Sequence, residues 1–198
     1  MNPTGDRFEK MREKTRARIR EAAVALFAQK GLEATSVADI AETAGVSAGL
    51  IYRHYRAKDD LFIELADEAR AGLASLRAAF EAGEPVPTIG SITQDICRDM
   101  TQDGRFLNIM IIITRALLMN DARLQPLIEE DKAMLAALAG MIARGQRAGD
   151  FRAGDARAMA CAYIATVQGA FVMRAALGAD FCVPTPEVLQ AAICEGRD

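Results

Sequence analysis

The residue types that most often carry catalysis or hold metals are sparse in this sequence. His54 is the only histidine, and no acidic or nucleophilic residue lies at a helical spacing that would make it a general base. The four cysteines are far apart and form no C-x-x-C pair, so they lack the spacing of a zinc site. No glycine-rich motif that cradles a phosphate is present. The sequence therefore predicts neither an enzyme active site nor a bound cofactor or metal.

Basic residues are the remaining candidates for chemistry, and they gather in the first third of the chain. Between Arg7 and Lys58 there are eleven basic and six acidic residues, a net charge of +5, although the whole chain carries −3. Such an asymmetry is expected where one end of a protein meets a polyanion such as nucleic acid. A solvated basic helix surface gives the same count, so charge alone leaves both interpretations open.

Length and composition define the scaffold that must position these charges. The chain has 198 residues, of which 51% are apolar and only 6% aromatic, and Ala, Leu, Met and Arg are plentiful. Such a composition is too apolar for a disordered chain and favours helices. The apolar run from Phe106 to Met119 is interrupted by Asn108 and Arg115, so it predicts a buried helix and not a membrane span. The N-terminal segment is polar, without the apolar stretch of a secretory signal. We therefore expect an all-α, soluble, cytoplasmic protein with reduced cysteines.

Local signals place three helices early in the chain. Apolar residues recur at helical spacing over residues 19–27, and Gly31 ends this first helix. Ser36 and Asp39 then form the S-x-x-D pattern of a capping box. A second helix is therefore expected to begin at Val37.

The turn after this second helix has the length typical of a helix-turn-helix motif. Gly45 ends the second helix, and Ser47 is expected to cap a third helix from Ala48 to about Tyr55. With Ile51 facing the core, a helical wheel leaves one face of the third helix directed outward. The residues of that face are Gly49, Leu50, Tyr52 and Arg53. The glycine removes bulk, so this helix can seat deeply in a groove.

The segment SVADIAETAGVSAGLIYRHYRAKDDLF resembles the N-terminal DNA-binding region of TetR-type (TetR/AcrR) transcriptional regulators. The resemblance rests on D-I-A-x-x-A-G-V-S, I-Y-x-H-Y and K-x-x-L, and it extends from about Thr15 to Phe62. It implies a helix-turn-helix DNA-binding domain over residues 7–57 and a ligand-binding and dimerisation domain over residues 58–198. It also implies a homodimer formed through the last two helices, with a palindromic double-stranded DNA operator and a small-molecule effector as partners.

The resemblance and the helical wheel together indicate which side chains meet DNA. Arg53 is expected to read a guanine in the major groove, and a solvated arginine is the alternative. Tyr52 and Lys58 are expected to bind phosphates, Lys58 together with the free N–H groups of the helix that follows. Leu50 replaces the threonine that the family usually has. Residues 10–18 form either an arm along the phosphates or a solvated face. The expected DNA-binding residues are Thr35, Ser36, Ser47, Ala48, Gly49, Leu50, Tyr52, Arg53, His54 and Lys58.

Six further helices are expected after the motif, which gives about nine in all. Their expected ranges are Asp59 to about Phe80, Thr88 to Met100, Arg105 to Met119, about Ala122 to Ala148, a helix capped by Asp155 that runs to Leu177, and Pro186 to about Cys194.

Apolar stripes in this second part of the chain include a few polar residues, and they form either a ligand cavity or a filled core. The resemblance favours a cavity for a small, largely apolar ligand. The candidate ligand-binding residues are Phe106, Met110, Ile113, Thr114, Leu117, Met134, Leu138, Met141, Tyr163, Val167 and Gln168.

The sequence therefore predicts a dimeric, sequence-specific DNA-binding transcriptional regulator, a repressor that a small molecule releases from its operator. The alternative from another class is a helical small-molecule-binding enzyme or carrier with a vestigial helix-turn-helix motif. A DNA binder without a ligand is a third interpretation. Turnover of a small molecule without DNA binding would favour the enzyme, and stabilisation by a compound would favour the sensor.

Overall fold

The computed structural model describes residues 3–102 and 104–194, and this part of the chain is helical throughout, without a strand. The described α-helices are α1 (Pro3–Lys30), α2 (Val37–Ala44), α3 (Ala48–Tyr52), α4 (Lys58–Ala82), α5 (Pro85–Thr101), α6 (Arg105–Leu118), α7 (Gln125–Ala148), α8 (Ala156–Leu177) and α9 (Pro186–Gln190). Two short 3-10 helices, η1 (Ala122–Leu124) and η2 (Gly178–Asp180), precede α7 and follow α8. The expected all-α fold is confirmed.

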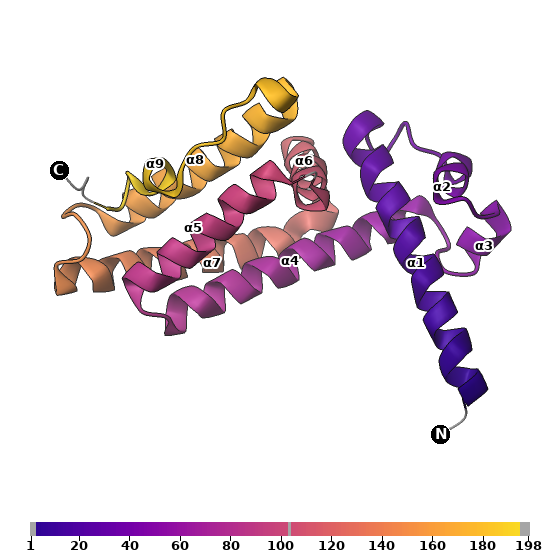
Figure 1. Ribbon diagram of the computed structural model, residues 1–198, viewed down its shortest axis with the longest axis horizontal. Coiled ribbons are helices and arrows are strands. Elements are labelled where there is room, and N and C mark those ends of the chain that lie inside the picture. Colours follow the sequence, from indigo (N-terminus) through magenta and orange to yellow (C-terminus); the bar gives the residue numbers. More distant parts are fainter. Residues whose placement is uncertain (1–2, 103, 195–198) are drawn as a thin grey trace.

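The helices form two groups that α4 connects. Figure 1 shows α1, α2 and α3 at one end, and α5, α7, α8 and α9 packed as a bundle at the other. Near the start of α4, Leu61 and Phe62 are buried in the core of the first group. Near its end, Phe80 is buried in the core of the bundle. A rigid displacement of α4 would therefore move the N-terminal helices relative to the bundle.

The core beneath the N-terminal helices also includes α6. Ile19 and Phe27 of α1 are buried in the same cluster as Ile109, Ile112 and Ile113 of α6. This cluster crosses the division expected between residues 57 and 58, so the two parts share one apolar contact surface. The division itself stays a prediction.

Several helix boundaries differ from the sequence-based expectation. The helix α3 ends at Tyr52 and α9 ends at Gln190, both earlier than expected, because single turns replace their last residues. The helix α5 begins at Pro85, earlier than expected, because a proline in the first turn of a helix needs no partner for an N–H group. The 3-10 helix η1 replaces the expected first turn of α7.

Among the described residues, one segment is long and apolar enough to cross a membrane by length and composition. It runs from Ala156 to Asp180, and its most apolar stretch of 18 residues has a mean hydropathy of 1.4 and is 28% buried. A core helix of a soluble protein passes the same test, so this is weak evidence for a span. The segment matters here because α8 leaves several apolar residues exposed.

Candidate DNA-binding surface

The second helix begins at a complete capping box. The Ser36 hydroxyl accepts a hydrogen bond from the Asp39 N–H at 3.1 Å, and the Asp39 carboxylate accepts one from the Ser36 N–H at 2.9 Å. Lys30 at the end of α1 donates to the same carboxylate at 2.7 Å. These contacts, with the Lys30 hydrogen bond first, lower the pKa of Asp39 to about 2. These contacts fix the start of α2 to the end of α1. The S-x-x-D pattern predicted the capping box but not the contact with Lys30.

The turn between α2 and α3 is fixed by a glycine and by an arginine from α1. Gly45 has a φ of 62°, in the left-handed region that side chains disfavour. The Arg18 guanidinium donates to the carbonyl oxygens of Ala44 at 2.5 Å and of Gly45 at 3.2 Å. A Cβ atom on residue 45 would lie 2.8 Å from this guanidinium. The glycine therefore provides both the backbone conformation and the space that Arg18 uses.

The third helix is short, and its last residue and the arginine that follows it are exposed to solvent. The Ser47 hydroxyl caps it by accepting from the Leu50 N–H at 3.2 Å, and Ile51 anchors it in the core with 1% of its surface exposed. Tyr52 is 57% exposed, and Arg53 is exposed without a hydrogen bond or ion pair to any described residue. The expected outward face of α3 is therefore present. The preceding helix α2 and the turn between α2 and α3 are held by the contacts described above.

The structure places most of the expected DNA-binding residues on this surface. The exposed ones are Ser36, Ser47, Ala48, Gly49, Tyr52 and Arg53, and the half-buried ones are Leu50 and His54. Burial lowers the pKa of His54 first, and the positive charges of Arg12, Arg16 and Arg53 lower it further, against a smaller opposing effect of Glu13. The surface around the end of α3 is thus electropositive, as phosphate binding requires.

Thr35 requires a correction, because it lies inside the protein. It is 2% exposed, and its hydroxyl donates to the Gly31 carbonyl oxygen at 2.7 Å. Its N–H donates to the Leu32 carbonyl oxygen at 3.2 Å. Thr35 therefore closes the connection between α1 and α2 and has no free donor for a DNA phosphate.

Lys58 requires a second correction, because its ammonium group is already saturated. Its Nζ donates to the carbonyl oxygens of Leu32 at 2.8 Å, Glu33 at 3.0 Å and Thr35 at 3.2 Å. An ammonium group has three donors, so none remains for the expected phosphate. The structure gives Lys58 a different role, which is to attach the start of α4 to the connection between α1 and α2.

Replacing Lys58 with Met should lower the free energy of unfolding by about 1–3 kcal/mol, because three carbonyl groups, two of them in partly buried contacts, lose a charged partner. Urea unfolding measures this change. The control is Arg56→Met, since the Arg56 side chain is exposed and has no partner among the described residues. Unchanged stability of Lys58→Met together with weaker DNA binding would restore the phosphate role.

Comparison with known proteins identifies the family. The family model described as "Bacterial regulatory proteins, tetR family" matches residues 19–65, which include this surface. The chain is 31% identical over 167 residues to the HTH-type transcriptional regulator TtgR of Pseudomonas putida, covering 79% of this chain and 78% of that protein. The chain belongs to the TetR family. It is also 32% identical over 104 residues to AcrR of Shigella flexneri, a match that covers 51% of this chain and about half (48%) of that relative.

The fold also matches solved structures of TetR-type regulators. FadR from Bacillus subtilis, solved in complex with stearoyl-CoA, has a TM-score of 0.63 and 20% identity, and the match covers 89% of this chain and 94% of that one. TetR-family proteins are transcriptional regulators and not enzymes, so the alternative of an enzyme or carrier with a vestigial motif is not favoured.

In this TetR-family protein the expected ligand-binding residues do not form one group. Five of them are buried together in the core of the bundle, namely Met134, Leu138, Met141, Tyr163 and Val167. Ile113 is instead in the core beneath the N-terminal helices. Met110 and Thr114 are half-buried on the same helix, α6. The expected group therefore divides between two cores.

Three of the expected ligand-binding residues are exposed and lie outside the buried cores, and their assignment stays a prediction. Gln168 lies on the outer face of α8, and Phe106 and Leu117 are 42% and 41% exposed. Tyr163 is the one expected polar residue that is deeply buried, and its hydroxyl lies 2.8 Å from that of Thr93, which donates to the Ile89 carbonyl oxygen. Tyr163 therefore donates to Thr93. Sequence analysis missed Thr93, because its partner lies 70 positions away in the chain.

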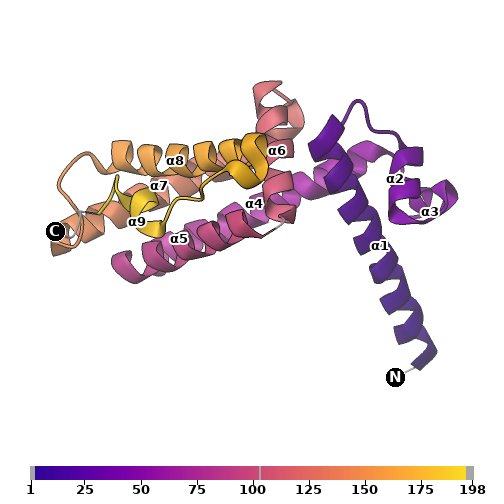
Figure 2. The ribbon, with the colours of Figure 1, turned by 45° about the horizontal axis from the view of Figure 1, so that its top comes forward.

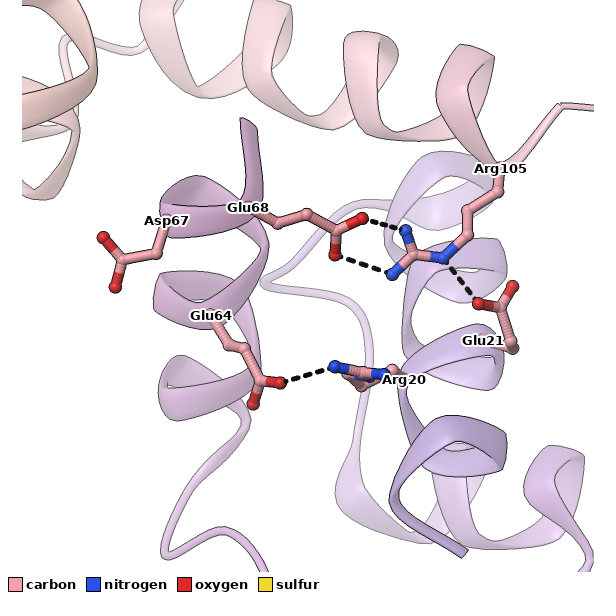
Figure 3. A pocket seen from close by; sticks show the side chains of 6 residues that line it. All are labelled: Arg20, Glu21, Glu64, Asp67, Glu68 and Arg105. Carbon is pink, nitrogen blue, oxygen red and sulfur yellow. Dashed lines mark hydrogen bonds and ion pairs between the residues drawn. The ribbon is translucent and has the colours of Figure 1, made fainter. Parts of the chain in front are cut away.

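Sequence analysis also missed a cluster of ion pairs where α1, α4 and α6 meet. Figure 3 shows it around a cleft of about 650 Å³. Arg105 at the start of α6 binds both carboxylate oxygens of Glu68 in α4, at 2.5 and 2.8 Å, and also Glu21 in α1 at 2.5 Å. Arg20 of α1 donates to Glu64 of α4 at 3.1 Å. Each helix at this junction is thus linked to the other two.

Glu64 is the centre of the links between α1 and α4. It accepts from Arg16 at 2.9 Å as well as from Arg20. Partial burial favours a higher pKa for Glu64, but the hydrogen bonds from the two arginines outweigh it and lower the pKa. Arg16 also donates to the hydroxyl of the buried Tyr55 at 3.1 Å. Arg16 and Arg20, two of the eleven basic residues counted in the sequence, therefore form ion pairs within the protein, as Lys30 does with Asp39.

Proposed function

We propose that this TetR-family protein is a homodimeric repressor that binds a palindromic DNA operator through α3 and leaves it when a small, largely apolar molecule binds the bundle. The observation that carries the proposal is the exposed face of α3, held by a capped turn and bearing an unpaired arginine. The proposal places the protein in the cytoplasm, where the operator is.

The chemistry of α3 suits the major groove of DNA. A Cβ atom on Gly49 would meet nothing within 4 Å, so the exposed side of the helix is flat at this position. Arg53 can donate two parallel hydrogen bonds to a guanine, and Tyr52 can reach a phosphate from the edge of the helix. The half-buried Leu50 offers an apolar contact for a thymine methyl group.

The exposed side of α8 supports the proposed homodimer. Val172, Met173 and Leu177 are 52%, 47% and 46% exposed, and Val188 of α9 is 60% exposed. Gly169 is exposed, with open space where a Cβ atom would lie. An exposed apolar helix of this kind is expected to pair with its symmetry mate. Such pairing would set two copies of α3 at half-sites about 34–36 Å apart, or a multiple of that distance.

The buried core of the bundle supports the proposed ligand site. Its two methionines in α7, Met134 and Met141, are flexible side chains that can rearrange around a ligand. The Tyr163 and Thr93 hydroxyl pair is the polar group that could orient it. FadR, with its bound stearoyl-CoA, is a structural neighbour whose ligand has a long apolar chain.

A series of contacts supports a proposed route from that core to the DNA-binding helices. Phe106 of α6 contacts Phe171 of α8 edge to face, with ring centroids 5.2 Å apart, and Phe171 is buried in the bundle core. The residue immediately before Phe106 is Arg105, which binds Glu21 of α1. A ligand that displaces α8 would thus pull on α1 through two adjacent residues. To switch the protein, it must bind the DNA-free arrangement more tightly.

Arg105→Gln should preserve operator binding and reduce the response to a ligand. Its ion pairs are partly exposed, so losing them should cost about 1 kcal/mol or less of stability. The test measures the anisotropy of a labelled operator while adding a compound that raises the melting temperature of the wild-type protein. The control is Arg98→Gln, because among the described residues the Arg98 side chain pairs only with Asp95 of its own helix. A ligand response equal to that of the wild type would refute this route. If no stabilising compound weakens operator binding, the ligand-free DNA binder is the better account.

A further inference from the structure

The first helix is much longer than the core that it covers. It has 28 residues, but Ile19 is the first residue of α1 in the apolar core. The side chains of residues 7–14 are all exposed. Figures 1 and 2 show from two directions that this N-terminal half of α1 projects beyond α2 and α3. Residues 7–14 thus form a helical arm beside the DNA-binding surface.

One side of the arm continues the core-facing stripe of α1, but there the stripe is exposed to solvent. At about 100° per residue, Phe8 and Arg12 lie within about 20° of Ile19 around the helix. Phe8 is 69% exposed, and Met11 beside this stripe is 59% exposed. The arm therefore exposes the Phe8 ring and the Arg12 guanidinium on the same side of α1 that faces the apolar core from Ile19 onwards.

The charge on this side matches a phosphate backbone. Arg12 contributes to the lowered pKa of His54, which directly follows α3, so the arm and the end of α3 share one electropositive surface. Arg16 is neutralised by Glu64, whereas Arg12 and Arg53 make no hydrogen bond or ion pair with the described residues. Two unneutralised guanidinium groups on one surface favour a polyanion over a second protein copy or an apolar partner.

We propose that residues 7–14 of α1 lie against the DNA backbone beside the groove that α3 occupies, with Arg12 bound to a phosphate and Phe8 covering the adjacent sugar. This inference rests on the proposed function and extends the DNA contact beyond the helix-turn-helix motif. Because a phosphate contact carries no base identity, the arm contributes affinity and position but no sequence preference.

The test compares Arg12→Gln with Lys14→Gln on the DNA fragment that the wild-type protein selects from genomic fragments. Both residues are exposed and make no hydrogen bond or ion pair with described residues, and both changes remove one positive charge while keeping a good helix former. Lys14 lies about 160° around the helix from Arg12. Arg12→Gln should reduce the slope of log affinity against log salt by about 0.9, and Lys14→Gln should leave it nearly unchanged.

Ethylation interference locates the contact directly. The wild-type protein should show at least one sensitive phosphate that Arg12→Gln does not, while base preferences and the melting temperature stay the same. Equal effects of the two variants would contradict the proposed contact between Arg12 and a phosphate. They would indicate only a general electrostatic attraction between α1 and DNA. A changed oligomeric state of Arg12→Gln with an unchanged salt slope would assign the face to a protein contact instead. If the wild-type protein selects no fragment, the proposed function itself fails, which is a separate outcome.

Discussion

Gly169→Glu is expected to convert the protein into monomers and to weaken operator binding by about 10²–10⁴-fold, the advantage that two linked half-site contacts provide. Gly169 is exposed on α8 with open space around it, so the substitution should not disturb the folded monomer. In a two-fold interface the change appears twice, and each carboxylate would be buried without a partner. Light scattering measures the mass, and anisotropy of a labelled operator measures the affinity.

A matched control comes from another exposed glycine on a bundle helix. Gly140 of α7 is also exposed with nothing within 4 Å of an added Cβ atom. Gly140→Glu should leave both mass and affinity unchanged. The neighbouring Ala170 is unsuitable, because it is 7% exposed and a charge there would disrupt the core of the monomer. A monomeric Gly169→Glu protein with undiminished operator affinity would remove the two-half-site account.

Arg53→Ala should cost about 1–3 kcal/mol of binding on the preferred operator and relax base preference at one position in each half-site. The free energy of unfolding should not change, because Arg53 is exposed and has no hydrogen bond or ion pair among the described residues. Binding to a series of operators with single base changes measures both effects.

Arg56→Ala is the comparison for Arg53, because it removes another exposed, unpartnered arginine that follows α3. It should weaken all sequences alike or not at all, and it should keep the base preferences of the wild type. Should Arg53→Ala also keep them, Arg53 is an anchor and another residue of α3 reads the bases.

Sequence reasoning succeeded where a signal was local. The pair Ser36 and Asp39 predicted the start of α2, and Ser47 predicted the start of α3, because a cap acts within three or four residues of the chain. Gly45 predicted the turn for the same reason, since its positive φ depends on its own backbone. These three signals suffice for the helix-turn-helix geometry.

The errors concern side chains whose partners are distant in the sequence. Lys58 has the residue type and position of a phosphate contact, but its donors are used by carbonyl groups 23–26 residues earlier. Arg105 binds carboxylates 37 and 84 residues away. No local pattern reports such pairs, because packing of α1, α4 and α6 creates them. Helical spacing likewise did not reveal that Gln168 lies on an exposed face of α8, since spacing alone does not show which face is covered.

The most direct test of the account is selection of genomic DNA fragments by the wild-type protein, with Arg53→Ala in parallel. The account predicts that fragments enriched by the wild type share two inverted copies of one half-site, with centres about 34–36 Å apart or a multiple of it. It also predicts that Arg53→Ala loses the preference at one position of each copy. Enrichment of fragments without an inverted repeat, or identical preferences of the two proteins, would contradict operator recognition by a pair of α3 helices.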